Sequence, residues 1–377
     1  MAEHWLLPTR LFDGHTLHSG MAACVKNGVI TRLAAKAPAG VMVLNGTLCP
    51  GFFDIQINGG GGVLFNTSPH REGLAAIAKA HHNIGTRHWL PTVITDAPEV
   101  LEAAVNAVLE SFGDFGIAGI HIEGPHIALA RKGTHKPSFI RPLDARTIAQ
   151  LKRLRARNIP VLLTLAPEAA TPAQVAEITA MGVTVSLGHT NATAAEAEAL
   201  LAAGATLFTH LFNAMSQMEN RAPGVVGAAI NSRAYTSIIA DGLHVDPSML
   251  ALACRARPVA NRMILVTDAM PTVGGPDHFE LYGGTVFLKD GRLINPQGTL
   301  AGAHTTIMDG IATLQNAGIS LEEALRMATS NPAALMGLEA QVGGLVGAPV
   351  THALVLGEAR PPMALEAVLC SGPIGAA

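Results

Sequence analysis

Eight short apolar segments recur between residues 52 and 268, and helical patterns separate most of them. They cover residues 52–58, 88–95, 117–122, 159–166, 182–189, 205–210, 235–241 and 262–268. Eight βα units over roughly 220 residues are typical of a (β/α)8 TIM-type barrel, an α/β fold. A doubly wound sheet would have fewer strands, and Gly59–Gly62 lacks the following helix that a phosphate-binding glycine turn needs. The rhythm therefore predicts a barrel.

Both ends of the chain have a different pattern. Residues 1–48 contain short β-type segments separated by turn signals such as Asn27-Gly28, and residues 352–356 and 365–370 also have the character of strands. We expect these segments to form one small β-sandwich domain from residues 1–48 plus 343–377. The barrel would then occupy residues 49–342.

Composition and charge exclude several classes of function. The net charge is −3 without a basic run, which argues against a nucleic-acid partner. Hydrophobic residues make up 49% of the chain, yet we find no charge-free run long enough to cross a membrane and no signal-peptide pattern at the start. The four cysteines lack CxxC spacing, so free thiols in a reducing cytoplasm are expected.

Polar residues at the predicted strand ends suggest a metal site. Active-site groups of such barrels lie at the carboxyl ends of the strands, where this chain has Glu123, His189 and His210. A carboxylate at the mouth of an apolar strand is costly unless a positive group meets it. One carboxylate and two imidazoles are a common ligand set for catalytic Zn²⁺. A single histidine is usually structural, but three suitable ligands at three strand ends favour a divalent cation.

Other strand-end and loop residues suggest further roles. Asp268 ends the last barrel strand and would act as a general base beside the metal, rather than as a helix cap. His135 is on a long loop where a surface histidine is common, but over the barrel mouth it could polarise a substrate carbonyl. Arg221 and His244 could hold an anionic substrate group, and backbone N–H groups around Asn213 could face a phosphate.

Several motifs together resemble those of the N-acetylglucosamine-6-phosphate deacetylases in the amidohydrolase superfamily. They extend in the same order over nearly the whole chain, and Glu-Gly-Pro with a later Thr-His-Leu-Phe-Asn-Ala-Met is the most specific combination. The motifs are Pro50-Gly-Phe-Phe-Asp-Ile-Gln-Ile-Asn-Gly, His121-Ile-Glu-Gly-Pro, Lys132-Gly-Thr-His, Ser186-Leu-Gly-His-Thr, Thr209-His-Leu-Phe-Asn-Ala-Met and Val266-Thr-Asp-Ala.

The resemblance implies hydrolysis of the acetamide of N-acetylglucosamine 6-phosphate, which gives glucosamine 6-phosphate and acetate. By position it implies metal ligands at Glu123, His189 and His210, an acid/base at Asp268, and a carbonyl-polarising group at His135. It also implies a homodimer in which some phosphate contacts come from the neighbouring subunit. The implied sugar-phosphate contacts are Asn213 and Ala214 through their backbone, Arg221 and His244.

Two departures from the family pattern modify these expectations. Many superfamily members have His-x-His after the first strand and bind two metals, whereas this chain has Gln56 and Asn58. Amide oxygens are poor ligands for Zn²⁺, so we expect one ion per chain, with Zn²⁺ first and Fe²⁺ or Mn²⁺ as alternatives, and Gln56 near its water. His304, in Leu300-Ala-Gly-Ala-His-Thr-Thr, is expected to line the sugar pocket differently, which leaves N-acetylgalactosamine 6-phosphate open as a substrate.

Two alternative functions fit the sequence less well than this hypothesis. A cyclic-amide hydrolase of the same superfamily usually needs a second metal and often a carboxylated lysine, and no barrel strand here ends in lysine. A catalytically silent barrel that serves as a binding scaffold would not need an intact Glu123, His189, His210 and Asp268. The sequence therefore favours the metal-dependent hydrolase.

Overall fold

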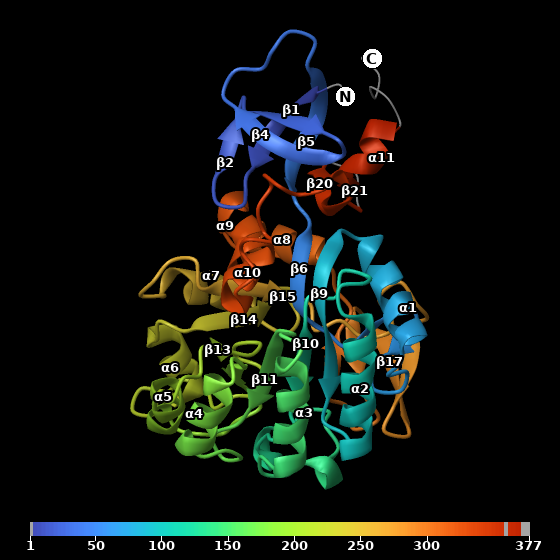
Figure 1. Cartoon of the computed structure of the whole chain (residues 1–377). Helices are drawn as coiled ribbons and strands as arrows, with labels where there is room; N and C mark the ends of the chain where they lie inside the picture. The colour runs from blue at the N-terminus through green and yellow to red at the C-terminus, as the bar shows by residue number, and fades with distance from the viewer. Residues whose placement is uncertain (1–2, 358–360, 371–377) are drawn as a thin grey trace.

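A parallel barrel forms the centre of the molecule in the computed structural model, which describes residues 3–357 and 361–370 (Figure 1). The sheet runs in the order β15-β14-β13-β12-β11-β10-β9-β6, and a parallel bridge between Ile57 and Ala269 joins its two edges. All eight predicted strands are present, and the barrel is confirmed. They are β6 Phe52–Ile57, β9 Thr86–Ile94, β10 Ile120–Glu123, β11 Val161–Leu165, β12 Thr184–Leu187, β13 Leu207–Phe208, β14 Tyr235–Ile239 and β15 Met263–Val266.

Helices cover the outside of the barrel, and polar side chains cap the first turn of several of them. Thr171 and Thr193 form capping boxes at the starts of α4 and α5, and Asp144 caps α3. The helices of the barrel region are α1 Arg71–His82, α2 Pro98–Ser111, α3 Ala145–Arg155, α4 Pro172–Ala180, α5 Ala194–Ala202, α6 Gly224–Asn231, α7 Pro247–Arg255, α8 Ile307–Asn316, α9 Leu321–Ala328 and α10 Ser330–Met336, with short 3₁₀ turns at Leu129–Arg131 and Pro137–Phe139.

Strands from both ends of the chain form a second sheet of seven strands. β20 pairs antiparallel with β5, which brings the two ends of the chain together, as expected for a small β-domain built from both. Figure 1 shows this sheet at one end of the barrel, with α8, α9 and α10 between them. Its strands are β1 His4–Phe12, β2 Leu17–Ser19, β3 Ala22–Lys26, β4 Val29–Ala34, β5 Met42–Pro50, β20 Ala353–Leu356 and β21 Met363–Ala364, and a 3₁₀ turn covers Val350–His352.

The predicted strand at residues 365–370 is wrong, because Leu365–Cys370 is the helix α11. Within it Leu365 and Val368 are buried, three residues apart, as one face of a helix requires. The chain after Asp268 forms a separate four-stranded sheet, and a bridge between Ala303 of its last strand and Ala269 connects it to the barrel. Its strands are β16 His278–Leu281, β17 Gly284–Lys289, β18 Arg292–Ile294 and β19 Leu300–Ala303, and a small pair, β7 Gly59–Gly60 with β8 Val63–Leu64, follows β6.

The structure also bears on the state of the cysteines and on membrane-spanning helices. Cys24, Cys49, Cys254 and Cys370 are all free thiols. Among the described residues, no helix is both long enough and apolar enough to span a membrane.

Candidate functional site

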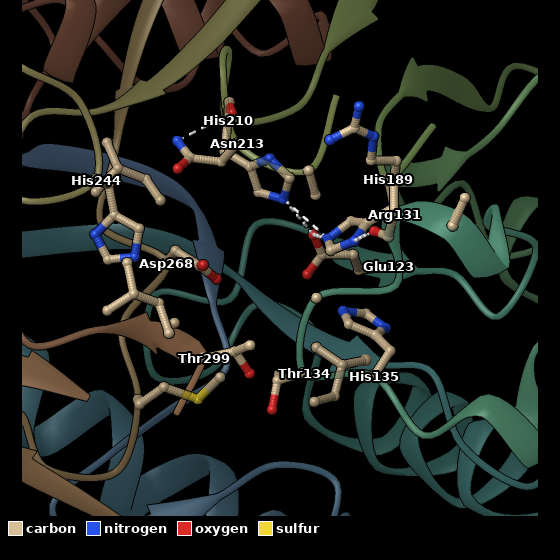
Figure 2. Close-up of a pocket in the computed structure, with 18 residues that line it drawn as sticks. Glu123, Arg131, Thr134, His135, His189, His210, Asn213, His244, Asp268 and Thr299 are labelled. Atoms are coloured by element: carbon tan, nitrogen blue, oxygen red, sulfur yellow. Dashed lines mark hydrogen bonds and ion pairs between the residues drawn. The ribbon is translucent and has the colours of Figure 1, made fainter. Parts of the chain in front are cut away.

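Three side chains from the ends of β10, β12 and β13 converge at the carboxyl end of the barrel (Figure 2). Oε1 of Glu123 lies 3.3 Å from Nε2 of His189 and 3.0 Å from Nε2 of His210. The two nitrogens lie 3.1 Å apart, and all three side chains are buried. Three ligand atoms that meet inside 4.8 Å of one another could hold a metal ion.

The hydrogen bonding of His189 supports that assignment. Its Nδ1 lies 2.9 Å from the carbonyl oxygen of Arg131, which can only accept, so Nδ1 carries the hydrogen. The lone pair is then on Nε2, which points toward Glu123 and His210. A histidine that donates its outer nitrogen to a carbonyl while the inner one faces a carboxylate has the arrangement of a metal ligand.

The surroundings of Glu123 stabilise the ionised form of its buried carboxyl group. Burial raises the pKa of this carboxyl, but the hydrogen bonds and charges of His189 and His210 outweigh burial and hold the pKa well below its usual range. Nε2 of Gln56 adds a donor 3.1 Å from Oε1 of Glu123. The carboxylate is therefore ionised and can bind a cation.

Asp268 shares a donor with Glu123. Nε2 of Gln56 lies 3.2 Å from Oδ1 of Asp268, and Nδ2 of Asn58 lies 2.7 Å from the same oxygen. Burial first, and the charge of Glu123 second, raise the pKa of Asp268 to about 6. A carboxylate with a pKa near neutrality can take up a proton and release it again, which a general acid/base must do.

His135 reaches the same place from the loop after β10. Its ring centre lies 4.4 Å from that of His189, and its Nδ1 lies 2.6 Å from Oγ1 of Thr95. Burial, with a further contribution from His189, lowers the pKa of His135 to about 3. The imidazole is therefore neutral, and one of its nitrogens can donate only if the other accepts.

These groups border one cavity of about 400 Å³. Figure 2 shows Asp268 and His244 on one side of it and Glu123, His189 and His135 on the other. Nδ1 of His244 lies 2.6 Å from Oδ2 of Asp241, which orients the ring. The lining residues are Ile94, Glu123, Ala130, Arg131, Gly133, Thr134, His135, His189, His210, Asn213, Ala214, Ile239, His244, Asp268, Met270, Thr299, Leu300 and Gly302.

Three residues predicted as substrate contacts are not part of that lining. Gln56 is buried behind Glu123 and Asp268 and contacts both. Arg221 is exposed on the loop before α6. His304 is also exposed, and its Nδ1 lies 3.0 Å from Oγ1 of Thr272, a residue that does not line the cavity either.

Sequence reasoning missed other lining residues, among them Arg131, Thr134 and Thr299. Arg131 and Thr134 belong to the Arg131-Lys-Gly-Thr-His135 stretch in which only His135 drew attention. Arg131 contributes its backbone carbonyl to His189, a role that no side-chain pattern can reveal. Thr299 comes from the sheet inserted after Asp268, whose path over the barrel is a matter of tertiary structure.

The backbone is also unusual at three of these residues. His189, His210 and Asp268 have φ values of +48°, +35° and +52°, in the left-handed region that residues other than glycine rarely adopt. Each is the second residue after the end of a barrel strand. Backbone strain of this kind clusters at functional sites, where the surrounding structure enforces it.

A comparison with known protein families agrees with this geometry. The model of the amidohydrolase family matches residues 47–346, which is most of the chain. The chain belongs to the amidohydrolase family. Members of this family depend on metal, in agreement with the Glu123, His189 and His210 set.

Individual relatives within the amidohydrolases are more specific. An N-acetylgalactosamine-6-phosphate deacetylase of Shewanella sp. (strain ANA-3) is 43% identical over 296 residues, which cover 77% of this chain and 74% of the relative. An N-acetylglucosamine-6-phosphate deacetylase of Haemophilus influenzae is 34% identical over 307 residues, 79% of each chain. The crystal structure of an N-acetylglucosamine-6-phosphate deacetylase from Pasteurella multocida superposes with a TM-score of 0.87 at 30% identity, and covers 96% of this chain and 97% of that one. The chain therefore groups with the deacetylases of amino-sugar 6-phosphates.

Proposed function

We propose that this amidohydrolase removes the acetyl group of N-acetyl-D-glucosamine 6-phosphate, giving D-glucosamine 6-phosphate and acetate. The observation that carries the proposal is the convergence of Glu123, His189 and His210 beside Asp268 in one cavity. The names of the relatives supply the substrate class.

The metal would be held by Glu123, His189 and His210. When bound, a divalent ion would lower the pKa of a water molecule and polarise the substrate carbonyl. We infer one ion per chain, because this chain has Gln56 where a second metal ion would need an imidazole ligand. The amide nitrogen of Gln56 donates to Glu123 and Asp268 and cannot bind a metal ion. Zn²⁺ is the proposed ion, and Fe²⁺ and Mn²⁺ are alternatives with the same ligands.

Asp268 moves the protons of the reaction in this proposal. Its carboxylate takes a proton from the attacking water as the water adds to the acetamide carbon. Asp268 then delivers that proton to the nitrogen of the sugar, which leaves as an amine when the C–N bond breaks. The raised pKa of Asp268 suits both steps.

His135 would stabilise the negative charge that develops on the carbonyl oxygen. In the neutral ring, Nδ1 would accept a hydrogen bond from the hydroxyl of Thr95, so that Nε2–H is free to donate into the cavity. A donor aimed at such an oxygen typically contributes ~3–4 kcal/mol to transition-state stabilisation.

The phosphate end of the substrate would be held by His244 and by the backbone of Asn213 and Ala214, all of which line the cavity. Arg221 is exposed outside it, so its predicted contact requires either movement of its loop or a site shared with a second subunit. The homodimer, the reducing cytoplasm as location, the contact from His304 and the domain limits 1–48 with 343–377 and 49–342 also stay predictions.

Acetate release from the metal-loaded protein tests the proposal. Asp268→Asn is expected to keep about one ion per chain and to lose about 10²–10⁴-fold in kcat, because the acid/base is gone. Asp290→Asn, at an exposed turn, is the matched control and should retain wild-type turnover. If Asp268→Asn releases acetate at a comparable rate, Asp268 is not the acid/base. If the metal-loaded wild type releases none from either amino-sugar phosphate, the function is refuted.

N-Acetylgalactosamine 6-phosphate is the second candidate substrate. It is favoured by one observation, the 43% identity to a relative with that name, compared with 34% for the Haemophilus enzyme. The two sugars differ only in the configuration of the hydroxyl group at C4. A tenfold higher kcat/KM for the galacto substrate, about 1.4 kcal/mol in transition-state binding, would transfer the assignment to it.

A further inference from the structure

The barrel carries a group of buried polar side chains next to the candidate metal site. The interior of such barrels is usually filled with branched apolar side chains. Here six consecutive strands, from β9 to β14, each contribute one buried hydroxyl or imidazole side chain at or just past the strand. Buried polar groups are costly unless they are paired, so the pairing of these six shows what they do. They are Thr92, His121, Thr164, Ser186, Thr209 and Ser237.

Four of these side chains form a continuous series of hydrogen bonds, which we call the interior chain. Nε2 of His121 lies 2.8 Å from Oγ1 of Thr164, and that oxygen lies 2.7 Å from Oγ1 of Thr209. Oγ1 of Thr209 lies 2.5 Å from Oγ of Ser186 at the end of the series. β11 and β13 are not neighbours in the sheet, so the bond between Thr164 and Thr209 joins strands that the backbone does not pair.

The interior chain packs against the segments that carry two of the metal ligands. Thr164 and Glu123 are paired residues of β11 and β10. A Cβ at Gly188, the residue before His189, would lie 2.9 Å from Cγ2 of Thr164 and 2.9 Å from Cβ of Thr209. Gly188 therefore lies directly on these two threonines, and only a residue without a side chain fits there. The hydrogen bond between the threonines fixes the surface on which the backbone before His189 rests.

The third ligand, His210, is held by its backbone. It directly follows Thr209 in the sequence, and its backbone N–H donates to Oγ of Ser237 over 2.8 Å. His189 and His210 both have positive φ values, +48° and +35°. Such conformations persist only where the surrounding structure enforces them. The interior chain and Ser237 provide contacts of that kind at both histidines.

We propose that the interior chain positions Glu123, His189 and His210 for metal binding. This inference rests on the metal site of the proposed function and extends it to residues that do not touch the ion. Thr164 is the central positioning residue, because it bonds to neighbours on both sides, packs against Gly188 and pairs with Glu123. Groups that orient metal ligands in this way typically change metal affinity about 10–100-fold when they are removed.

The zinc affinity of the metal-free, full-length protein tests the proposal, measured by competition with a chromogenic chelator. Thr164→Val keeps the shape of the side chain but removes its hydroxyl, and we expect the Kd for Zn²⁺ to rise about 10–100-fold. Thr236→Val on β14 is the matched control. Thr236 is equally buried, and its Oγ1 has no hydrogen-bond partner among the described residues, so the Kd of this variant should equal that of the wild type.

Two further variants separate hydrogen bonding from packing and from folding. Thr164→Ser keeps the hydroxyl but lacks the Cγ2 that faces Gly188, so its Kd should stay closer to the wild-type value than that of Thr164→Val. Ser186→Ala removes only the last hydroxyl of the interior chain and should also raise the Kd. It replaces Thr164→Val as the test if circular dichroism shows that Thr164→Val does not fold.

The outcomes distinguish a positioning role from a structural one. A lower free energy of unfolding in urea together with an unchanged Kd, in whichever of Thr164→Val and Ser186→Ala serves as the test, overturns the proposal. So does a larger rise in Kd for Thr164→Ser than for Thr164→Val, which would assign the effect to packing. An equal rise in Thr236→Val would make it a general result of losing a buried hydroxyl, and would overturn the proposal too. If the wild type itself binds no zinc, the metal site of the proposed function is refuted with it.

Discussion

At the scale of single residues, the hydrogen bond between Thr95 and Nδ1 of His135 determines which nitrogen of the His135 ring can donate into the cavity. Thr95→Val keeps the shape but removes the hydroxyl 2.6 Å from Nδ1 of His135. We expect kcat to fall about 10–100-fold, the effect typical of losing a group that orients an active-site histidine. Metal content should not change, and Thr95→Ser should restore most of the activity. Unchanged kcat in Thr95→Val, measured by acetate release, would remove the orienting role of Thr95.

The residues that the sequence identified are those that follow from one rule. Glu123, His189, His210 and Asp268 were found because strand ends of a barrel meet at one edge, and their types suit a metal and a base. Thr95 and Arg131 were not found, since one acts through a neighbouring side chain and the other through a backbone carbonyl. Arg221 was selected by its charge, and the structure leaves it exposed.

At the scale of elements, the capping box of α4 makes a stability prediction. Oγ1 of Thr171 accepts from the backbone N–H of Gln174, and Oε1 of Gln174 accepts from the backbone N–H of Thr171. Thr171→Ala should lower the free energy of unfolding by about 0.5–2 kcal/mol, because alanine lacks the hydroxyl that accepts from the backbone N–H of Gln174. Thr171→Ser, which keeps the hydroxyl, should lose less. Urea denaturation with identical midpoints for the wild type and the alanine variant would contradict this.

Strands and helices were predictable where they are long enough to show a repeating pattern of apolar residues, or where a clear capping residue begins them. The segment 365–370 was not, because six residues with apolar positions fit a strand and a helix equally well. Helix α10 was not predicted either, and its Pro332 lies in the first turn, where proline is tolerated. In both cases packing against the rest of the molecule selected the helix.

At the scale of the whole molecule, Gly14 is a point where the terminal sheet meets the chain after the barrel. It has φ +116°, and a Cβ there would lie 2.5 Å from the carbonyl oxygen of Gly343 and 3.0 Å from Cα of Gly344. Gly20 also has a positive φ, +71°, but a Cβ there would meet nothing within 4 Å. The two glycines therefore separate backbone strain from a clash between the two parts of the molecule.

Alanine at these positions should reveal how strongly that junction is held. Gly20→Ala should cost about 1–2 kcal/mol of unfolding free energy, from backbone strain alone. Gly14→Ala should cost a further ~1–3 kcal/mol, since the methyl group must push the 343–344 backbone away. Both variants should retain kcat at low temperature, because Asp268 and the metal ligands lie at the other end of the barrel. If urea denaturation shows that Gly14→Ala and Gly20→Ala lose the same unfolding free energy, the 343–344 backbone can move away from the added methyl group at no cost. The contact of Gly14 with Gly343 would then not hold the terminal sheet against the barrel.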